Sequence, residues 1–129
     1  MKSLILLASA VLALAVCGRQ HWPDAEMIEN FIRHRSEFGR LLEMVQADKY
    51  LQRVDDNWTD PNDPKGIGVT SERIAEYRRL FASCAVPRGF EAYHRDEQIL
   101  FIASAMGMAT GWSSKSYAYR ATGRNGRGD

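Results

Sequence analysis

The spacing of apolar residues changes near Pro87, and this change constrains the fold more than any other feature of the sequence. Before Pro87, apolar residues recur every three or four positions, as they do on one face of a helix. After it, apolar residues such as Phe90 and Ala92 alternate with polar ones, as they do along a strand. Helices followed by strands predict an α+β fold, with the helices packed on an antiparallel sheet.

The sequence predicts two helices. The long one covers residues 24–48, and its Gly39, which costs roughly 1 kcal/mol relative to alanine in a helix, suggests that another element packs closely there. The second helix begins at Thr70 or Ser71, which are both good N-cap residues. It ends before Pro87, because the residue before a proline disfavours helical backbone. The apolar stripe of the long helix contains Ile28, Phe31, Phe38, Leu42 and Val45.

Three strands are expected after the second helix. Residues 54–70 are rich in Asp, Asn, Pro and Gly and are interpreted as a loop. The first strand starts at Phe90, the second covers the β-branched and aromatic residues 98–105, and the third covers the alternating residues 115–121. The predicted architecture is therefore a long helix and a second helix packed on a three-stranded antiparallel β-meander.

The beginning of the chain differs from the rest. After a positive start at Lys2, residues 4–16 form a run of thirteen apolar or small residues, which is the pattern of a secretory signal peptide. As a helix this run measures roughly 20 Å, less than the ~30 Å hydrocarbon layer of a membrane. The expected organisation is a signal peptide (1–16), a tether (17–23), a single α+β domain (24–122) and a disordered tail (123–129).

Cys17 follows this run directly, and three fates are open to it. The stretch Leu14-Ala15-Val16-Cys17 resembles the bacterial lipobox, in which the cysteine receives a diacylglycerol, although Val16 replaces the usual Gly, Ala or Ser. Alternatively, a signal peptidase cuts after the A-x-A site at residues 13–15 and leaves Cys17 free. A free Cys17 in an oxidising compartment can pair with Cys84, the only other cysteine. We favour lipid attachment at Cys17.

The charge balance argues against a polyanionic partner. The chain has 17 basic and 16 acidic residues, and removal of Lys2 with the signal leaves 16 of each. A mature net charge near zero gives no electrostatic reason to expect nucleic acid.

The polar residues form no recognised catalytic or metal-binding motif. The histidines lack metal-ligand spacing, the aspartates of the 54–70 loop fail the EF-hand pattern, and the serines near Gly111 match neither G-x-S-x-G nor S-x-x-K. The sequence therefore predicts no catalytic residue, no metal site and no cofactor. The residues considered were His21, His34 and His94; Asp55, Asp56, Asp60 and Asp63; and Ser113, Ser114 and Ser116.

Three segments carry a family resemblance. Residues 31–48, 71–81 and 111–119 are similar to a group of small, uncharacterised bacterial envelope proteins with lipoprotein-type signals. The resemblance implies a bacterial origin and a membrane-anchored location facing the periplasm, or else a soluble periplasmic or secreted form. It implies no activity.

Three functions are compatible with these features. The first is a binding or interaction protein, anchored to the membrane by lipid, that uses Tyr117 and Tyr119 on the sheet face away from the helices to bind a protein partner. The second is a small periplasmic hydrolase or metal-assisted enzyme. The third is a truncated, non-functional product of a longer domain. We favour the binding protein.

Overall fold

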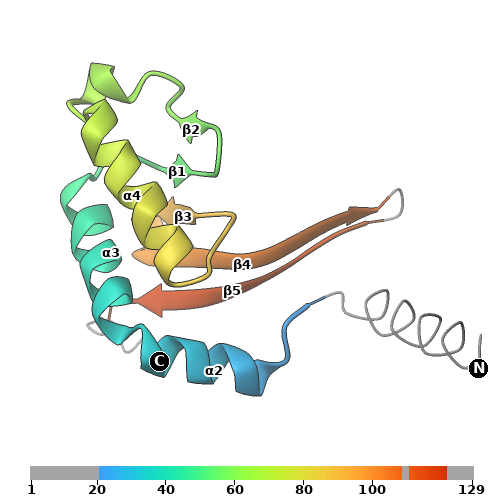
Figure 1. Ribbon diagram of the computed structural model, residues 1–129. Helices are drawn as coiled ribbons and strands as arrows, with labels where there is room; N and C mark the ends of the chain where they lie inside the picture. Colours follow the sequence, from blue (N-terminus) through green and yellow to red (C-terminus); the bar gives the residue numbers. More distant parts are fainter. Residues whose placement is uncertain (1–20, 109–110, 122–129) are drawn as a thin grey trace, which may run out of the picture.

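The computed structural model describes residues 21–108 and 111–121, and it has the α+β architecture that the sequence predicts (Figure 1). Residues 1–20 and 122–129, which include the predicted signal, Cys17 and the tail, lie outside the described residues. The helices are α2 (Asp24–Arg33), α3 (Arg35–Ala47) and α4 (Ser71–Ser83), with short 3-10 helices η1 (Pro64–Ile67) and η2 (His94–Asp96). The strands are β1 (Arg53–Val54), β2 (Thr59–Asp60), β3 (Phe90–Tyr93), β4 (Gln98–Met108) and β5 (Gly111–Arg120).

The sheet has five antiparallel strands in the order β2-β1-β3-β4-β5. The predicted strands are present as β3, β4 and β5, but the expectation of a three-stranded sheet is wrong. The two additional strands, β1 and β2, involve residues interpreted as a loop. Each has two residues, too few to show an alternating pattern, and their pairing depends on contacts distant in the sequence, such as the hydrogen bond from Ala92 N to Gln52 O (2.8 Å).

The predicted long helix is two helices that meet at His34. The backbone hydrogen bonds continue around the junction, from His34 N to Asn30 O (3.0 Å) and from Phe38 N to His34 O (3.1 Å), but His34 itself leaves helical geometry. Tertiary contacts of Asn30 hold α2 in its own direction, and such contacts leave no mark on a helical periodicity.

Helices α3 and α4 cover one face of the sheet and bury the core against it (Figure 1). Aromatic rings contact one another within this core: Tyr77 packs on Phe90 with ring centroids 5.2 Å apart, and Phe38 meets Phe101 edge-on at 5.8 Å. Gly39 has nothing within 4 Å of the position of an added Cβ, so the expectation that another element packs there is wrong.

Polar contacts fix α4 against the end of α3. Thr70 caps α4 as predicted, because its hydroxyl accepts a hydrogen bond from Arg73 N (3.1 Å). The Asp48 carboxylate at the end of α3 accepts hydrogen bonds from Arg73 Nε (3.0 Å) and the Tyr77 hydroxyl (2.7 Å). Burial raises the pKa of Tyr77, and the bond to Asp48 raises it further, so its hydroxyl remains a donor.

Candidate functional site: a groove at the edge of the sheet

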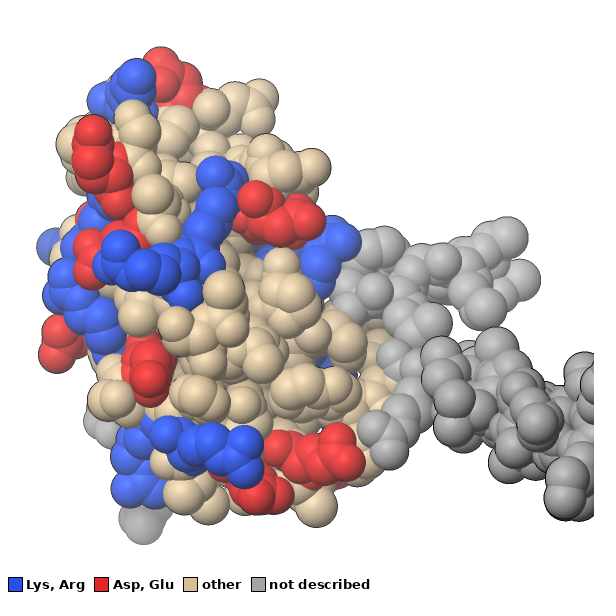
Figure 2. All heavy atoms as spheres, in the orientation of Figure 1, with Lys and Arg blue, Asp and Glu red and all other residues tan. Residues whose placement is uncertain are grey.

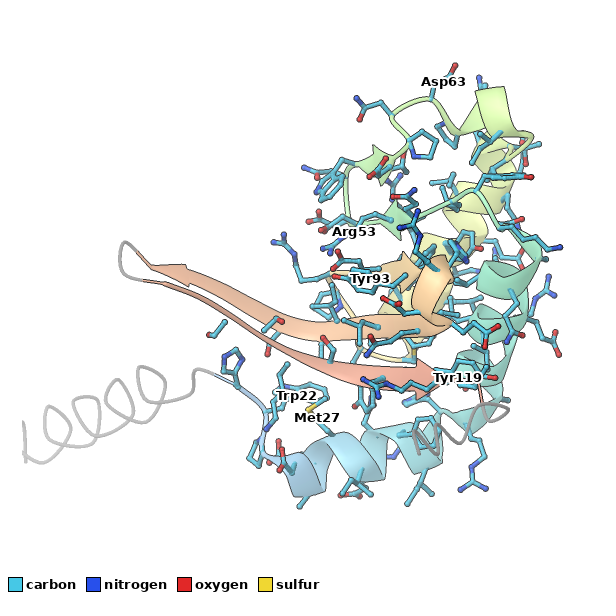
Figure 3. The ribbon with its side chains drawn as sticks, turned by 180° about the vertical axis from the view of Figure 1, so that it is seen from behind. Trp22, Met27, Arg53, Asp63, Tyr93 and Tyr119 are labelled. Carbon is cyan, nitrogen blue, oxygen red and sulfur yellow. The ribbon has the colours of Figure 1, made fainter. Side chains whose placement is uncertain are left out.

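Helix α2 lies along the outer strand of the sheet and overhangs its edge. Figure 3 shows Met27 on the side of α2 that faces β5, and both Met27 and Asn30 are buried there. Ile28 and Ile32 lie on the adjoining side of the helix and are 61% and 58% exposed. The sheet ends at β5, so these two apolar side chains have no strand beneath them.

Tyr117 of β5 fastens α2 to the sheet. Its hydroxyl donates to Met27 O (2.9 Å) and accepts from Asn30 Nδ2 (3.1 Å). The Asn30 amide also donates to Cys84 O (2.9 Å) at the end of α4. Burial raises the pKa of Tyr117, although the hydrogen bond from Asn30 lowers it in part, so the hydroxyl stays protonated and can donate.

Two adjoining hollows form a groove between α2, the start of α3 and β5. One has a volume of about 440 Å³ and the other about 240 Å³, and both are lined by Phe31, Tyr117 and Ala118. Most of the groove wall is apolar; the charged groups are Asp24 and Lys115 at one end and Arg35 at the other. Figure 2 shows an uncharged surface over β4 and β5, between the charged groups of α3 and α4 and those of α2.

The outer edge of β5 presents unpaired backbone groups to this groove. Ala121 N donates to Glu97 O (3.3 Å) on the β4 side. The hydrogen-bonding direction of the backbone alternates along a strand. The backbone N–H and C=O groups of Tyr117 and Tyr119 therefore also point toward β4, and those of Ser116, Ala118 and Arg120 point outward. In residues 21–108 and 111–121, no backbone group pairs with this edge.

Both predicted partner-face residues lie in this region. Tyr117 and Tyr119 are on the helix-covered side of the sheet, not on its open face, and both are partly buried against the core. Tyr117 is within the groove and Tyr119 borders its second hollow. Their part in partner binding stays a prediction. The two tyrosines lie on the helix-covered face of the sheet, whereas the open face was expected.

Asn30, which sequence reasoning missed, completes the link between α2 and the sheet. Its position three residues after Met27 places it on the buried stripe of α2, where a polar side chain requires a partner. The predicted stripe of Ile28 and Phe31 did not include it, and Ile28 is 61% exposed, so the periodicity gave no signal for Asn30.

A buried charge cluster underlies the β1–β2 end of the sheet. The fully buried Asp55 carboxylate is 2.7 Å from Arg53 Nη2 and 3.4 Å from Arg88 Nη2. Burial opposes ionisation, but the hydrogen bonds from Arg53 and from Asp56 N outweigh it and lower the pKa of Asp55. Glu91 pairs with Arg53 at 3.1 Å, so the cluster balances its charges and is a structural element.

The candidate catalytic residues do not assemble into a reactive site. His21 contacts the hydroxyls of Ser104 and Ser113, a proximity that the sequence did not predict, but no carboxylate orients its ring among the described residues. Within residues 21–108 and 111–121, no group of three or more His, Cys, Asp or Glu side chains could hold a metal ion. His94 contacts Leu51 O (3.1 Å) and His34 lies near Glu37 (3.7 Å), each in its own part of the fold.

Cys84 is buried in the core. Its thiol donates to Leu80 O (3.1 Å), and burial, with the Glu37 charge, raises its pKa to about 12. A thiol with this pKa is unreactive at neutral pH. Its predicted alternative partner, Cys17, lies outside the described residues.

Comparisons with known proteins found no match to a family model, a curated protein or a solved structure. Among the described helices, none has the length and apolar character needed to cross a membrane.

Proposed function

We propose that this chain is an exported bacterial envelope protein, held at the membrane by a lipid on Cys17, that binds an extended segment of a partner protein in the groove between α2 and β5. The observation that supports the binding role is an unpaired strand edge lying beside an overhanging apolar helix face. The backbone edge offers hydrogen bonds to an added strand, and the helix offers apolar contacts to its alternate side chains.

The geometry favours a single strand over a second copy of this chain. Two antiparallel β5 edges would pair about a two-fold axis perpendicular to the sheet, which places both α2 helices on the same side. Each helix already overhangs its own edge, so the two would compete for the same space. An isolated strand requires only the ~4.8 Å that separates neighbours in a sheet.

The groove also defines the chemistry of the partner segment. Side chains facing α2 would cover Ile28 and Phe31, which line the groove, and would reach the exposed Ile32 on the adjoining side of the helix, so they should be apolar. Those facing the open side of the sheet should be polar. An acidic residue is favoured near Arg35, which lines the groove without an ion-pair partner among the residues described. The accessible edge from Ser116 to Arg120 spans about 16 Å at 3.3 Å per residue.

Selection of short random peptides against the purified mature chain tests this function. A labelled selected peptide should lose at least about tenfold in affinity, measured by fluorescence polarisation, on the double variant Ile28→Asp/Ile32→Asp. Both side chains are mostly exposed, so the core remains intact. Ala118→Pro should weaken binding similarly, because it removes an outward N–H at an edge position where proline is tolerated.

Ala75→Asp on the exposed side of α4 is the matched control and should bind like the unmodified protein. The proposal fails if no peptide is recovered, or if the recovered peptides bind the groove and edge variants as tightly as they bind the control.

A further inference from the structure

A separate hollow lies at the other end of the sheet, between the β1–β2 turn, η1 and the start of α4. Its volume is about 540 Å³, within the range of small-molecule sites. Trp58, Asn57 and Asn62 line it from the chain around β2, Lys65 from η1 and Arg78 from α4. Figure 3 shows this end of the molecule near the labelled Asp63, remote from the α2–β5 groove at Met27.

A hydrogen bond to the backbone of Asp55 holds Arg78 in position. Its Nε donates to Asp55 O (3.2 Å), and the Asp55 side chain is itself fixed by Arg53 and Arg88. The two terminal guanidinium nitrogens of Arg78 have no protein partner within residues 21–108 and 111–121. They are therefore free to make the paired hydrogen bonds by which arginine recognises a carboxylate.

Trp58 is fixed by the same cluster. The Arg53 guanidinium carbon lies 5.2 Å from the centre of the indole ring, and Arg53 is bonded to both Asp55 and Glu91. The indole is nevertheless 45% exposed and borders the hollow. A large, exposed aromatic side chain held in place by a buried cluster offers a flat, preorganised contact surface.

The charge of the lining selects an anion. Lys65 and Arg78 bring two positive charges against one negative charge from Asp63, and neither cation forms a salt bridge with the residues described. The amides of Asn57 and Asn62 add donors and also acceptors, and an inorganic anion without a hydroxyl has no donor for those acceptors. An aromatic plane, planar amides and paired cations together match a ligand with a ring, several hydroxyls and an acidic group.

We propose that this hollow binds a sugar that carries a carboxylate. The sugar ring stacks on Trp58, the carboxylate pairs with Arg78 and Lys65, and the hydroxyls bond to Asn57 and Asn62. The site is independent of the α2–β5 groove and shares no lining residue with it.

Titration of the isotope-labelled mature chain with glucuronic acid, followed by nuclear magnetic resonance, tests the proposal. The Trp58 indole N–H signal should shift and saturate, and glucose and acetate should each bind at least about tenfold more weakly, because each lacks one part of the recognised group. Equal binding of acetate would reduce the hollow to a simple anion site and overturn the proposal. Absence of a saturable shift would also overturn it.

Three variants locate the binding. Arg78→Gln should weaken glucuronate binding at least about tenfold. Lys65→Gln should weaken it as well, and because Lys65 is exposed this variant keeps the test decisive if Arg78→Gln fails to fold. Arg79→Gln, one residue along α4 and exposed, should bind normally. A loss of binding in Arg79→Gln equal to that in Arg78→Gln would contradict the assignment.

Discussion

Single polar side chains decide how the parts of this molecule are joined. Asp55 joins the β1 region to the loop before β3 through Arg53 and Arg88, and Tyr117 joins α2 to the sheet through Met27 and Asn30. The Asp55 side chain is fully buried and Tyr117 is partly buried, and an unsatisfied partner in such a place costs more than the hydrogen bond gains. Substitutions that preserve size but remove the polar atom should therefore have large effects.

Asp55→Asn should lower the free energy of unfolding by about 3 kcal/mol at pH 7, because it leaves two arginines without their buried counter-charge. The pKa of Asp55 is lower in the folded state than the ~3.9 of an unfolded aspartate. Its stabilising contribution is therefore complete above pH ~4 and is lost as pH falls through the lowered folded-state pKa. Urea unfolding at pH 7 and below pH 3 should show the difference between the two proteins shrinking in acid; a constant difference would contradict the role of the carboxylate.

Tyr117→Phe should lower the free energy of unfolding by about 1–3 kcal/mol, because the hydroxyl that donates to Met27 O and accepts from the Asn30 amide is removed. Tyr119→Phe is the control. The Tyr119 hydroxyl makes only a long 3.5 Å contact with the exposed Gln46, so its removal should change stability by less than about 0.5 kcal/mol. Equal effects of the two substitutions in urea unfolding would show that the Tyr117 hydroxyl does not fasten α2.

At the level of elements, two glycines that look alike in the sequence have opposite roles. Gly89 has a φ of +68°, and a Cβ added there would lie 1.8 Å from Val54 O. It allows the backbones of the β1 and β3 regions to approach. Gly39 lies within α3 with open space around it. Only the folded backbone distinguishes the two.

Gly89→Ala should therefore lower the free energy of unfolding by at least about 3 kcal/mol, through strained backbone and a direct clash with β1. Gly39→Ala should raise it by up to about 1 kcal/mol, because alanine is the better helix former. Thermal unfolding of the two variants and the unmodified protein measures both changes in stability. A stable Gly89→Ala protein, or a destabilised Gly39→Ala protein, would contradict the contacts described for β1, β3 and α3.

The sequence allowed prediction of those elements that carry a local pattern. The change of period at Pro87 predicted that β3, β4 and β5 follow the helices, and Thr70, one of the two predicted N-cap residues, caps α4. The junction at His34 and the strands β1 and β2 were missed, because tertiary contacts produce them. Tyr117 and Tyr119 were identified as partner-face candidates, but the groove beside them depends on the direction of α2, which periodicity does not specify.

At the scale of the whole molecule, the proposed groove is formed by the edge of the sheet and by α2, the first described helix. A protein tethered by lipid at Cys17 would carry this groove close to the membrane, since only Gly18 to Pro23 separate the two. Two or three acyl chains would anchor it stably, each buried CH₂ contributing about 0.8 kcal/mol.

Intact mass of the mature protein from bacterial membranes tests this anchor. The lipid proposal predicts a chain that starts at Cys17 and carries added acyl mass. A soluble product that starts at Val16 would contradict it, and a disulfide between Cys17 and Cys84 in that product would establish the third fate. Cys17→Ser should release the protein from the membrane fraction, whereas Cys84→Ser should not.

Hydrogen exchange at single amides of β5 shows whether a bound peptide adds to the sheet edge as a strand. In the free protein, the outward amides of Ser116, Ala118 and Arg120 should exchange rapidly, while those of Tyr117 and Tyr119 are protected by β4. Binding of a selected peptide should slow exchange of the three outward amides by at least about tenfold, because each gains a strand partner. If the peptide binds and these three amides exchange as they do in the free protein, β5 does not accept a strand and the proposed function is wrong.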